Sequence, residues 1–260
     1  MDKPRFLALG SRLKNSPIVT TLGFRPNFDD YSDQEKHLLS AAEKIYFPTA
    51  FYADLFIAAG KKIFPSCRTY TYAQDKIRQS ALFKFLGIPH PETRFFFGPR
   101  QKRKILDYFP FPFIAKQARG SSMGKGVFLV RNHQDLTEYL TLNGPAYIQE
   151  YIPIDRDIRV IVIGYEIVLA FWRERPPGDF RTNISRGGTI RLNDIPKGAL
   201  DLALTTATRC GWDDVGLDIL EHNGSFSIIE ANMKYGRKGF TEAGIQYTAL
   251  LEQMMLSGKI

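Results

Sequence analysis

Short apolar runs separated by stretches with helical spacing predict an α/β unit in the first quarter of the chain. Strands are expected at residues 6–9, 18–21, 44–47 and 62–64. Helices are expected at 33–43 and at 49–59, and the second of these ends at Gly60. Strands that alternate with helices favour parallel pairing. Residues 1–73 are therefore predicted to form a small α/β domain.

The pattern changes after residue 73 to one that predicts mixed α+β structure. A strand, a glycine-rich loop, a second strand, a helix and a third strand follow one another between residues 113 and 151. The helices expected outside that segment lie at residues 73–87, 197–210 and 247–256. The strands and the helix of residues 113–152 are therefore expected to form a compact lobe.

Two apolar runs near the C-terminal end each carry an acidic residue. Asp218 lies in the first run and Glu230 in the second, and Gly224 marks a turn between them. A two-residue turn at Asn223-Gly224 would place the two acids on opposite faces of the hairpin. A three-residue loop, with Gly224 in the left-handed conformation, would place them diagonally on one face. Asn232 would share that face because strand side chains repeat every two residues.

Two carboxylates and an amide on one face suit a hard divalent cation. Mg²⁺ takes oxygen ligands, commonly a few carboxylates together with phosphate oxygens and water. Mn²⁺ accepts the same kinds of ligand. With the three-residue loop, Asp218, Glu230 and Asn232 are candidate metal ligands. The alternative is that each of them bonds to a loop or to a nearby arginine.

The segment KQARGSSMGKG has the composition of a phosphate-binding loop. Gly120, Gly124 and Gly126 allow backbone N–H groups to crowd onto a phosphate, and Ser121 and Ser122 add hydroxyl groups. The glycine spacing is not that of a Walker A loop. A glycine-rich hairpin loop that binds no ligand would have the same composition.

Other polar side chains nearby are candidate phosphate ligands. Lys116 lies in an apolar strand, where its ammonium group either meets an anion or extends towards solvent. Arg173, Arg181 and Asn183 lie in or beside a loop rich in proline, glycine and arginine. Guanidinium groups match the oxygens of a phosphate, although solvated arginines in a loop would show the same pattern.

The overall composition restricts the class of protein. The 260 residues are 44% hydrophobic and 24% charged, which is typical of a globular protein. No apolar run approaches the roughly 18 residues of a membrane span, and the N-terminus lacks the apolar core of a signal peptide. Cys67 and Cys210 stand alone, so we expect reduced thiols in a cytoplasmic protein. The net charge of +8 suggests a polyanionic partner, but the dispersed basic residues weaken the case for nucleic acid.

The chain resembles the RimK-like carboxylate–amine ligases of the ATP-grasp superfamily over about residues 74–245. Seven segments in order carry the resemblance: QDKIRQSALFKFLGIPHPET, PFIAKQARGSSMGKGVFLV, YIQEYI, RDIRVIVIG, FRTNISRGG, GLDIL and IIEAN. In that family two α+β lobes clamp ATP, with the smaller lobe as a lid, and a small α/β domain precedes them. The resemblance therefore implies an ATP-grasp fold of class α+β over residues 74–260. Its smaller lobe would lie at about 113–152 and its larger lobe at about 153–260.

The resemblance also implies nucleotide contacts for individual residues. Lys76 and Lys116 would contact the phosphates of ATP, and the loop from Gly120 to Gly126 would close over them. Glu150 and Tyr151 would lie at the adenine-binding hinge, where backbone amides and apolar side chains hold the purine.

Further roles follow from the same match. Asp157 falls at the position that binds the ribose, while Arg173 and Arg181 would stabilise the phosphoryl group in transfer. The Mg²⁺ ligands of the family match the three oxygen donors identified above, Asp218, Glu230 and Asn232.

Two features depart from the family pattern. Relatives commonly continue after the metal-binding asparagine with a small residue and then Ser-Pro-Gly, whereas this chain continues with Met233-Lys234-Tyr235-Gly236. The α/β domain, of about 73 residues, is also short for the family. Because both regions help to form the acceptor pocket, the resemblance leaves the substrates open.

The implied reaction is an ATP- and Mg²⁺-dependent ligation. A carboxylate attacks the γ-phosphate to give an acyl phosphate and ADP, and an amine then forms the amide and releases phosphate. Lys234, Arg237 and Lys238 suit an acidic acceptor, such as glutamate or an acidic peptide tail, although they also fit a solvated basic rim. Two rival classes are a non-catalytic nucleotide-binding adaptor and an RNA- or ribosome-binding protein, which would carry a module motif not found here. The oligomeric state, including a homo-oligomer, is left open.

Overall fold

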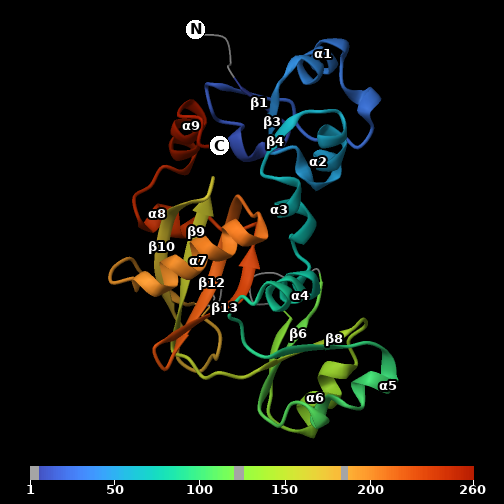
Figure 1. Ribbon diagram of the computed structural model, residues 1–260, viewed down its shortest axis with the longest axis vertical. Coiled ribbons are helices and arrows are strands. Elements are labelled where there is room, and N and C mark those ends of the chain that lie inside the picture. Colours follow the sequence, from blue (N-terminus) through green and yellow to red (C-terminus); the bar gives the residue numbers. More distant parts are fainter. Residues whose placement is uncertain (1–5, 120–125, 183–186) are drawn as a thin grey trace.

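The computed structural model describes residues 6–119, 126–182 and 187–260, which form three sheets and their surrounding helices (Figure 1). The N-terminal sheet is parallel, in the order β2-β1-β3-β4. Its strands are β1 (Phe6–Ala8), β2 (Val19–Thr21), β3 (Lys44–Tyr46) and β4 (Lys62–Phe64), and its helices are α1 (Asp33–Ala41), α2 (Thr49–Ala58) and α3 (Cys67–Tyr72). The parallel pairing of the four strands agrees with the sequence prediction, and α3 is an addition to it.

The second sheet belongs to the smaller lobe and is antiparallel, in the order β5-β8-β6-β7. Its elements are β5 (Thr93–Phe96), α5 (Gly98–Lys102), β6 (Phe113–Gln117), β7 (Val127–Val130), α6 (His133–Leu140) and β8 (Ala146–Glu150), and α4 (Lys76–Leu86) precedes them. The Asn132 side chain caps α6 by accepting a hydrogen bond from the Asp135 N–H at 2.9 Å. Proline has no N–H group to donate in a sheet. Pro89 and Pro91 both lie before β5, so β5 can still pair with β8.

The third sheet forms the larger lobe, in the order β11-β10-β9-β12-β13. Its elements are β9 (Arg156–Ile163), β10 (Glu166–Glu174), β11 (Thr189–Arg191), α7 (Lys197–Cys210), β12 (Asp214–His222), β13 (Ser225–Asn232), α8 (Lys238–Glu242) and α9 (Tyr247–Leu256). Helix α7 packs on one face through buried alanines beside Trp212. The other face packs against α8, α9 and the N-terminal sheet. Among the helices that the structure describes, none is long and apolar enough to cross a membrane.

The hairpin of β12 and β13 turns through two residues, and the three-residue loop favoured from the sequence is wrong. His222 pairs directly with Ser225. Asn223 and Gly224 between them have φ values of 50° and 75°, the left-handed conformations that a tight hairpin turn requires. Asparagine tolerates this conformation better than other residues with a side chain, so Asn-Gly closes the shorter turn.

A β-bulge nevertheless brings the two acids to one face. Ile219 pairs with Ile228, but the next pair along the hairpin is Asp218 with Glu230. Ile229 is therefore an extra residue in β13, and it shifts every later residue by one position. As a result Asp218 and Glu230 lie directly opposite each other rather than diagonally.

Candidate active site

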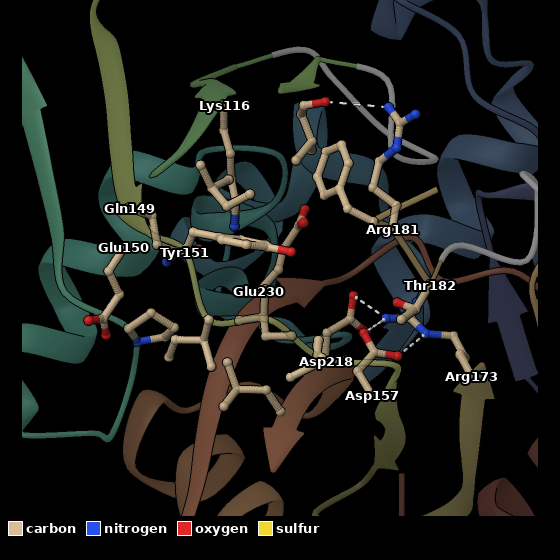
Figure 2. Close-up of a pocket in the computed structure, with 18 residues that line it drawn as sticks. Lys116, Gln149, Glu150, Tyr151, Asp157, Arg173, Arg181, Thr182, Asp218 and Glu230 are labelled. Carbon is tan, nitrogen blue, oxygen red and sulfur yellow. Dashed lines mark hydrogen bonds and ion pairs between the residues drawn. The ribbon is translucent and has the colours of Figure 1, made fainter. Parts of the chain in front are cut away.

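A pocket opens between the smaller lobe and the sheet of the larger lobe (Figure 2). Its empty volume, which includes space open to solvent, is about 770 Å³. The apolar side chains that line it come from both lobes and include Pro91, Ile114, Val127, Ile152, Ile154, Phe180, Leu220 and Ile229. Such walls can cover a flat organic ring while the charged side chains gather at the other end.

Most of the predicted site residues that the structure describes line this pocket: Lys116, Glu150, Tyr151, Asp157, Arg173, Arg181, Asp218 and Glu230. Lys76 and Asn232 border it by contacting two of these residues. Lys76 Nζ lies 3.1 Å from Glu230 Oε1, and Asn232 Nδ2 donates to Asp218 Oδ2 at 3.2 Å. Gly126 lies beside β6, where its carbonyl accepts from the Gln117 N–H at 2.7 Å. Other predicted residues lie outside the described ranges, namely Gly120, Ser121, Ser122, Gly124 and Asn183.

Lys116 is a buried cation directed into the pocket (Figure 2). Burial lowers the pKa of its ammonium group to about 8; Glu230 opposes this shift and Lys76 adds to it. Its Nζ lies 5.4 Å from the centre of the Tyr147 ring. A phosphate bound here would supply the anion that the buried ammonium group needs.

Arg173 is held rigidly by two carboxylates at the base of the pocket (Figure 2). Its Nε and Nη2 donate to the two oxygens of Asp157 at 2.8 and 2.5 Å, and Nη2 lies 3.0 Å from Asp218 Oδ2. Burial would lower the pKa of Arg173, but Asp157 and Asp218 raise it above its usual value. The guanidinium group is therefore a permanent positive charge, and a ribose at Asp157 would share that carboxylate with Arg173.

Arg159 is a site residue that the sequence analysis did not assign. It pairs with Asp218 across β9 and β12 and donates through Nε and Nη2 to both oxygens, the second at 2.9 Å. Burial would raise the pKa of Asp218, but Arg159 and Arg173 hold it below its usual range. A signal for Arg159 was present, because it interrupts an apolar run two residues after Asp157, on the same face of the strand.

Arg181 connects the two lobes at the mouth of the pocket. Its Nε donates to Asp179 Oδ1 at 2.8 Å, and its Nη1 donates to the Val127 carbonyl at 3.4 Å (Figure 2). Val127 begins β7 in the smaller lobe, whereas Arg181 follows β10 in the larger one. The guanidinium group is thus placed where it contacts both walls.

The donor set of the hairpin fits a magnesium ion that arrives with phosphate. Asp218, Glu230 and Asn232 provide two carboxylates and an amide on adjoining positions of one sheet face. In the part of the chain that the structure describes, no group of three or more His, Cys, Asp or Glu side chains could hold a metal by itself. An ion at this position would therefore rely on phosphate oxygens and water for its remaining ligands.

The segment that departs from the family pattern joins the larger lobe to the N-terminal domain. Tyr235 is buried, and its hydroxyl donates to Asp214 Oδ1. Arg12, which follows β1, lies 2.9 Å from Asp214 Oδ2 and 5.4 Å from the centre of the Tyr235 ring. Arg237 stacks on the Tyr247 ring at 4.7 Å. Tyrosine at position 235 therefore has a structural role at the contact between the two parts.

Comparison with known protein families agrees with this geometry. The model of the RimK-like ATP-grasp domain matches residues 73–255, so the chain belongs to that family. The structure of the ATP-grasp ligase PsnB complexed with minimal precursor, Mg and ADP superimposes with a TM-score of 0.70, covering 99% of each chain at 16% identity. That likeness shows the ATP-grasp fold, of class α+β, which the resemblance implied.

Sequence relatives match a little under two thirds of the chain. A "Probable alpha-L-glutamate ligase" from Enterobacter sp. (strain 638) is 34% identical over 176 residues, which are 65% of this chain and 58% of the relative. A "Ribosomal protein bS6--L-glutamate ligase" from Escherichia fergusonii is 32% identical over 174 residues, 64% of this chain and 58% of the relative. The matched segments thus span less than two thirds of the length of these relatives.

Proposed function

We propose that the protein is an ATP- and Mg²⁺-dependent carboxylate–amine ligase that releases ADP and phosphate through an acyl phosphate. The observation that carries the proposal is the position of Asp218 directly opposite Glu230, in a pocket that also holds Lys116 and Arg173. The two carboxylates suit a divalent ion, and the two buried cations suit phosphate groups. The pocket therefore fits a triphosphate together with its divalent ion better than it fits the triphosphate or the ion alone.

The residues of the pocket would act mainly by position and charge. Lys76 and Lys116 would hold the phosphates, and Arg173, already fixed by Asp157, would meet the charge that develops on the γ-phosphate during transfer. Asp218, Glu230 and Asn232 would hold Mg²⁺, which neutralises phosphate charge when bound. Loss of one fixed donor of this kind typically costs about 3 kcal/mol of barrier, or about a hundredfold in rate.

The apolar residues would protect the reaction from water. Ile114 of the smaller lobe and Leu220 and Ile229 of the larger lobe line the pocket. An acyl phosphate hydrolyses if water reaches it before the amine does, so exclusion of water favours amide formation. Arg181, which contacts both lobes, would help to keep the pocket closed.

We further propose that the acceptor is acidic, with glutamate as the amino acid added. Lys234, Arg237 and Lys238 are exposed on the segment that follows the hairpin. The names of the sequence relatives, which are glutamate ligases, support this choice of amino acid. The cytoplasmic location stays a prediction, which the free thiols Cys67 and Cys210 support.

A product assay tests the proposal. The protein would be incubated with MgATP, L-glutamate and a panel of acidic and neutral peptides, and nucleotide products and peptide masses would be measured. We expect ADP, phosphate and a peptide that has gained one glutamate residue, with acidic peptides preferred. Formation of AMP would contradict the acyl-phosphate route, and ATP binding without turnover across a broad panel would favour a nucleotide-binding adaptor. Equal use of acidic and neutral peptides would contradict the acidic acceptor alone.

A further inference from the structure

A run of basic side chains lies on the smaller lobe, outside the nucleotide pocket. Arg94 lies on β5, and four more basic residues lie on or just after α5: Arg100, Lys102, Arg103 and Lys104. The eleven residues from Arg94 to Lys104, here called the basic segment, contain no aspartate or glutamate. Within the described ranges, none of the five side chains forms an ion pair with a carboxylate.

Several exposed cations elsewhere on the protein have acidic partners. Lys62 lies 2.6 Å from Glu43, and Lys259 lies 2.7 Å from Glu166. Lys197 on α7 similarly pairs with an aspartate one turn later. Such surface pairs add little stability, but they cancel the local field. Among the residues that the structure describes, the cations of the basic segment have no such acidic partners, so their positive potential is not cancelled locally.

Exposed aromatic rings accompany these charges. Phe97, which begins α5, is 55% exposed, and Tyr108 is 48% exposed. The Arg94 guanidinium group lies 3.5 Å from the centre of the Tyr108 ring, and the Phe96 ring lies 5.9 Å from it. Helix α5 lies at the outer edge of the smaller lobe (Figure 1). Exposed rings among unpaired cations can bind bases and phosphates together.

We propose that the basic segment, with Tyr108, binds single-stranded nucleic acid. The cations would contact phosphates along the strand, and Phe97 and Tyr108 would stack on bases. An acidic polypeptide would use the cations but would gain little from two exposed rings, so the rings favour nucleic acid. No residue of the basic segment lines the nucleotide pocket, so this activity is separate from the proposed ligation.

The test is a binding titration with matched charge variants of the protein. A fluorescent single-stranded RNA of about 12 nucleotides and a poly-glutamate peptide would serve as probes. The first variant combines Arg100→Ala, Arg103→Ala and Lys104→Ala. The control combines Lys36→Ala, Lys62→Ala and Lys197→Ala, which removes the same charge from ion-paired surface positions. Thermal melting and ATP binding would confirm that both variants fold.

We expect the first variant to bind RNA at least tenfold more weakly and the control within about twofold of the unmodified protein. The plot of log K against log salt has a negative slope. The magnitude of this slope should decrease by about 0.7 for each phosphate that the variant no longer neutralises. Phe97→Ala should weaken RNA binding by about fivefold or more and leave poly-glutamate unaffected. Equal weakening in both triple variants, or tighter binding of poly-glutamate than of RNA, would overturn the proposal.

Discussion

Arg159 and Asp218 face each other across β9 and β12, and the arginine donates to both oxygens of the aspartate. Asp218 also accepts from Arg173 and Asn232, so its carboxylate is engaged by three donor side chains. Glu230 is paired in the same way with Lys76. The proposed divalent-ion site is thus surrounded by cations that would repel a metal ion arriving alone.

The first prediction is that divalent-ion binding depends on nucleotide. Mn²⁺, followed by electron paramagnetic resonance, should bind weakly to the free protein and much more tightly with a non-hydrolysable ATP analogue. Arg159→Met should raise the affinity for Mn²⁺ without nucleotide by about tenfold or more, because a unit positive charge beside the carboxylate is removed.

The matched control for this variant is Arg156→Met. Arg156 lies in the same strand, but its guanidinium group stacks on Trp172 at 4.0 Å rather than on a carboxylate of the site. It should leave Mn²⁺ binding unchanged. Tight Mn²⁺ binding by the unmodified protein without nucleotide would show that the arginines do not restrict the ion.

The second prediction concerns the pH dependence of ATP binding. The pKa of Lys116, about 8, lies below its unfolded value, so the free folded protein loses this proton as pH rises through 8. Bound phosphate favours the charged form and returns the proton. When ATP binds, Lys116 should therefore take up about half a proton from solvent at pH 8 and almost none at pH 6. The affinity for ATP should decline above pH 8.

Calorimetry in buffers of different ionisation enthalpy measures this uptake. Lys116→Met should abolish the proton uptake that accompanies ATP binding near pH 8. Lys62 is an exposed lysine outside the pocket, so Lys62→Met should retain this uptake. Identical proton uptake in both variants would rule out Lys116 as the group responsible.

The third prediction compares two glycines in one segment. A Cβ atom at Gly239 would lie 2.7 Å from Cζ of Phe171, which is buried in the core. Gly236 has open space at the same position. Gly239→Ala should lower the free energy of unfolding by about 1–3 kcal/mol, because the core has to shift. Chemical denaturation should find Gly236→Ala almost unchanged, and equal destabilisation would mean that the described packing of α8 is incorrect.

The fourth prediction concerns the contact between the N-terminal domain and the larger lobe. Tyr235→Phe removes the hydroxyl that donates to buried Asp214, so the free energy of unfolding should fall by about 1–3 kcal/mol. Tyr165→Phe, at an exposed tyrosine, should change it little. If the two variants unfold alike, the Asp214–Tyr235 hydrogen bond contributes nothing to stability.

Much of the fold was predictable because local signals agreed with it. The parallel pairing of the N-terminal sheet follows from the alternation of strands with helices along the chain. The bulge at Ile229 was not predictable, because two adjacent isoleucines hide the break in alternation. The two acids do share a face, but through the bulge and not through the three-residue turn expected from the sequence.

The candidate site was predictable where the family motifs reach, and not where distant segments meet. The Arg159–Asp218 pair requires the register between β9 and β12, which periodicity within each strand does not determine. Arg12 and Asp214 lie 202 positions apart in the sequence, and only the packed structure brings them together. The role of Tyr235 was missed for the same reason.

The most direct measurement of the central claim follows oxygen from the carboxylate to phosphate. A peptide acceptor that is shown to be a substrate would be labelled with oxygen-18 in its reacting carboxylate and incubated with MgATP and glutamate. Attack of that carboxylate on the γ-phosphate predicts one labelled oxygen in each phosphate released. Unlabelled phosphate, or label in AMP, would contradict ligation through an acyl phosphate.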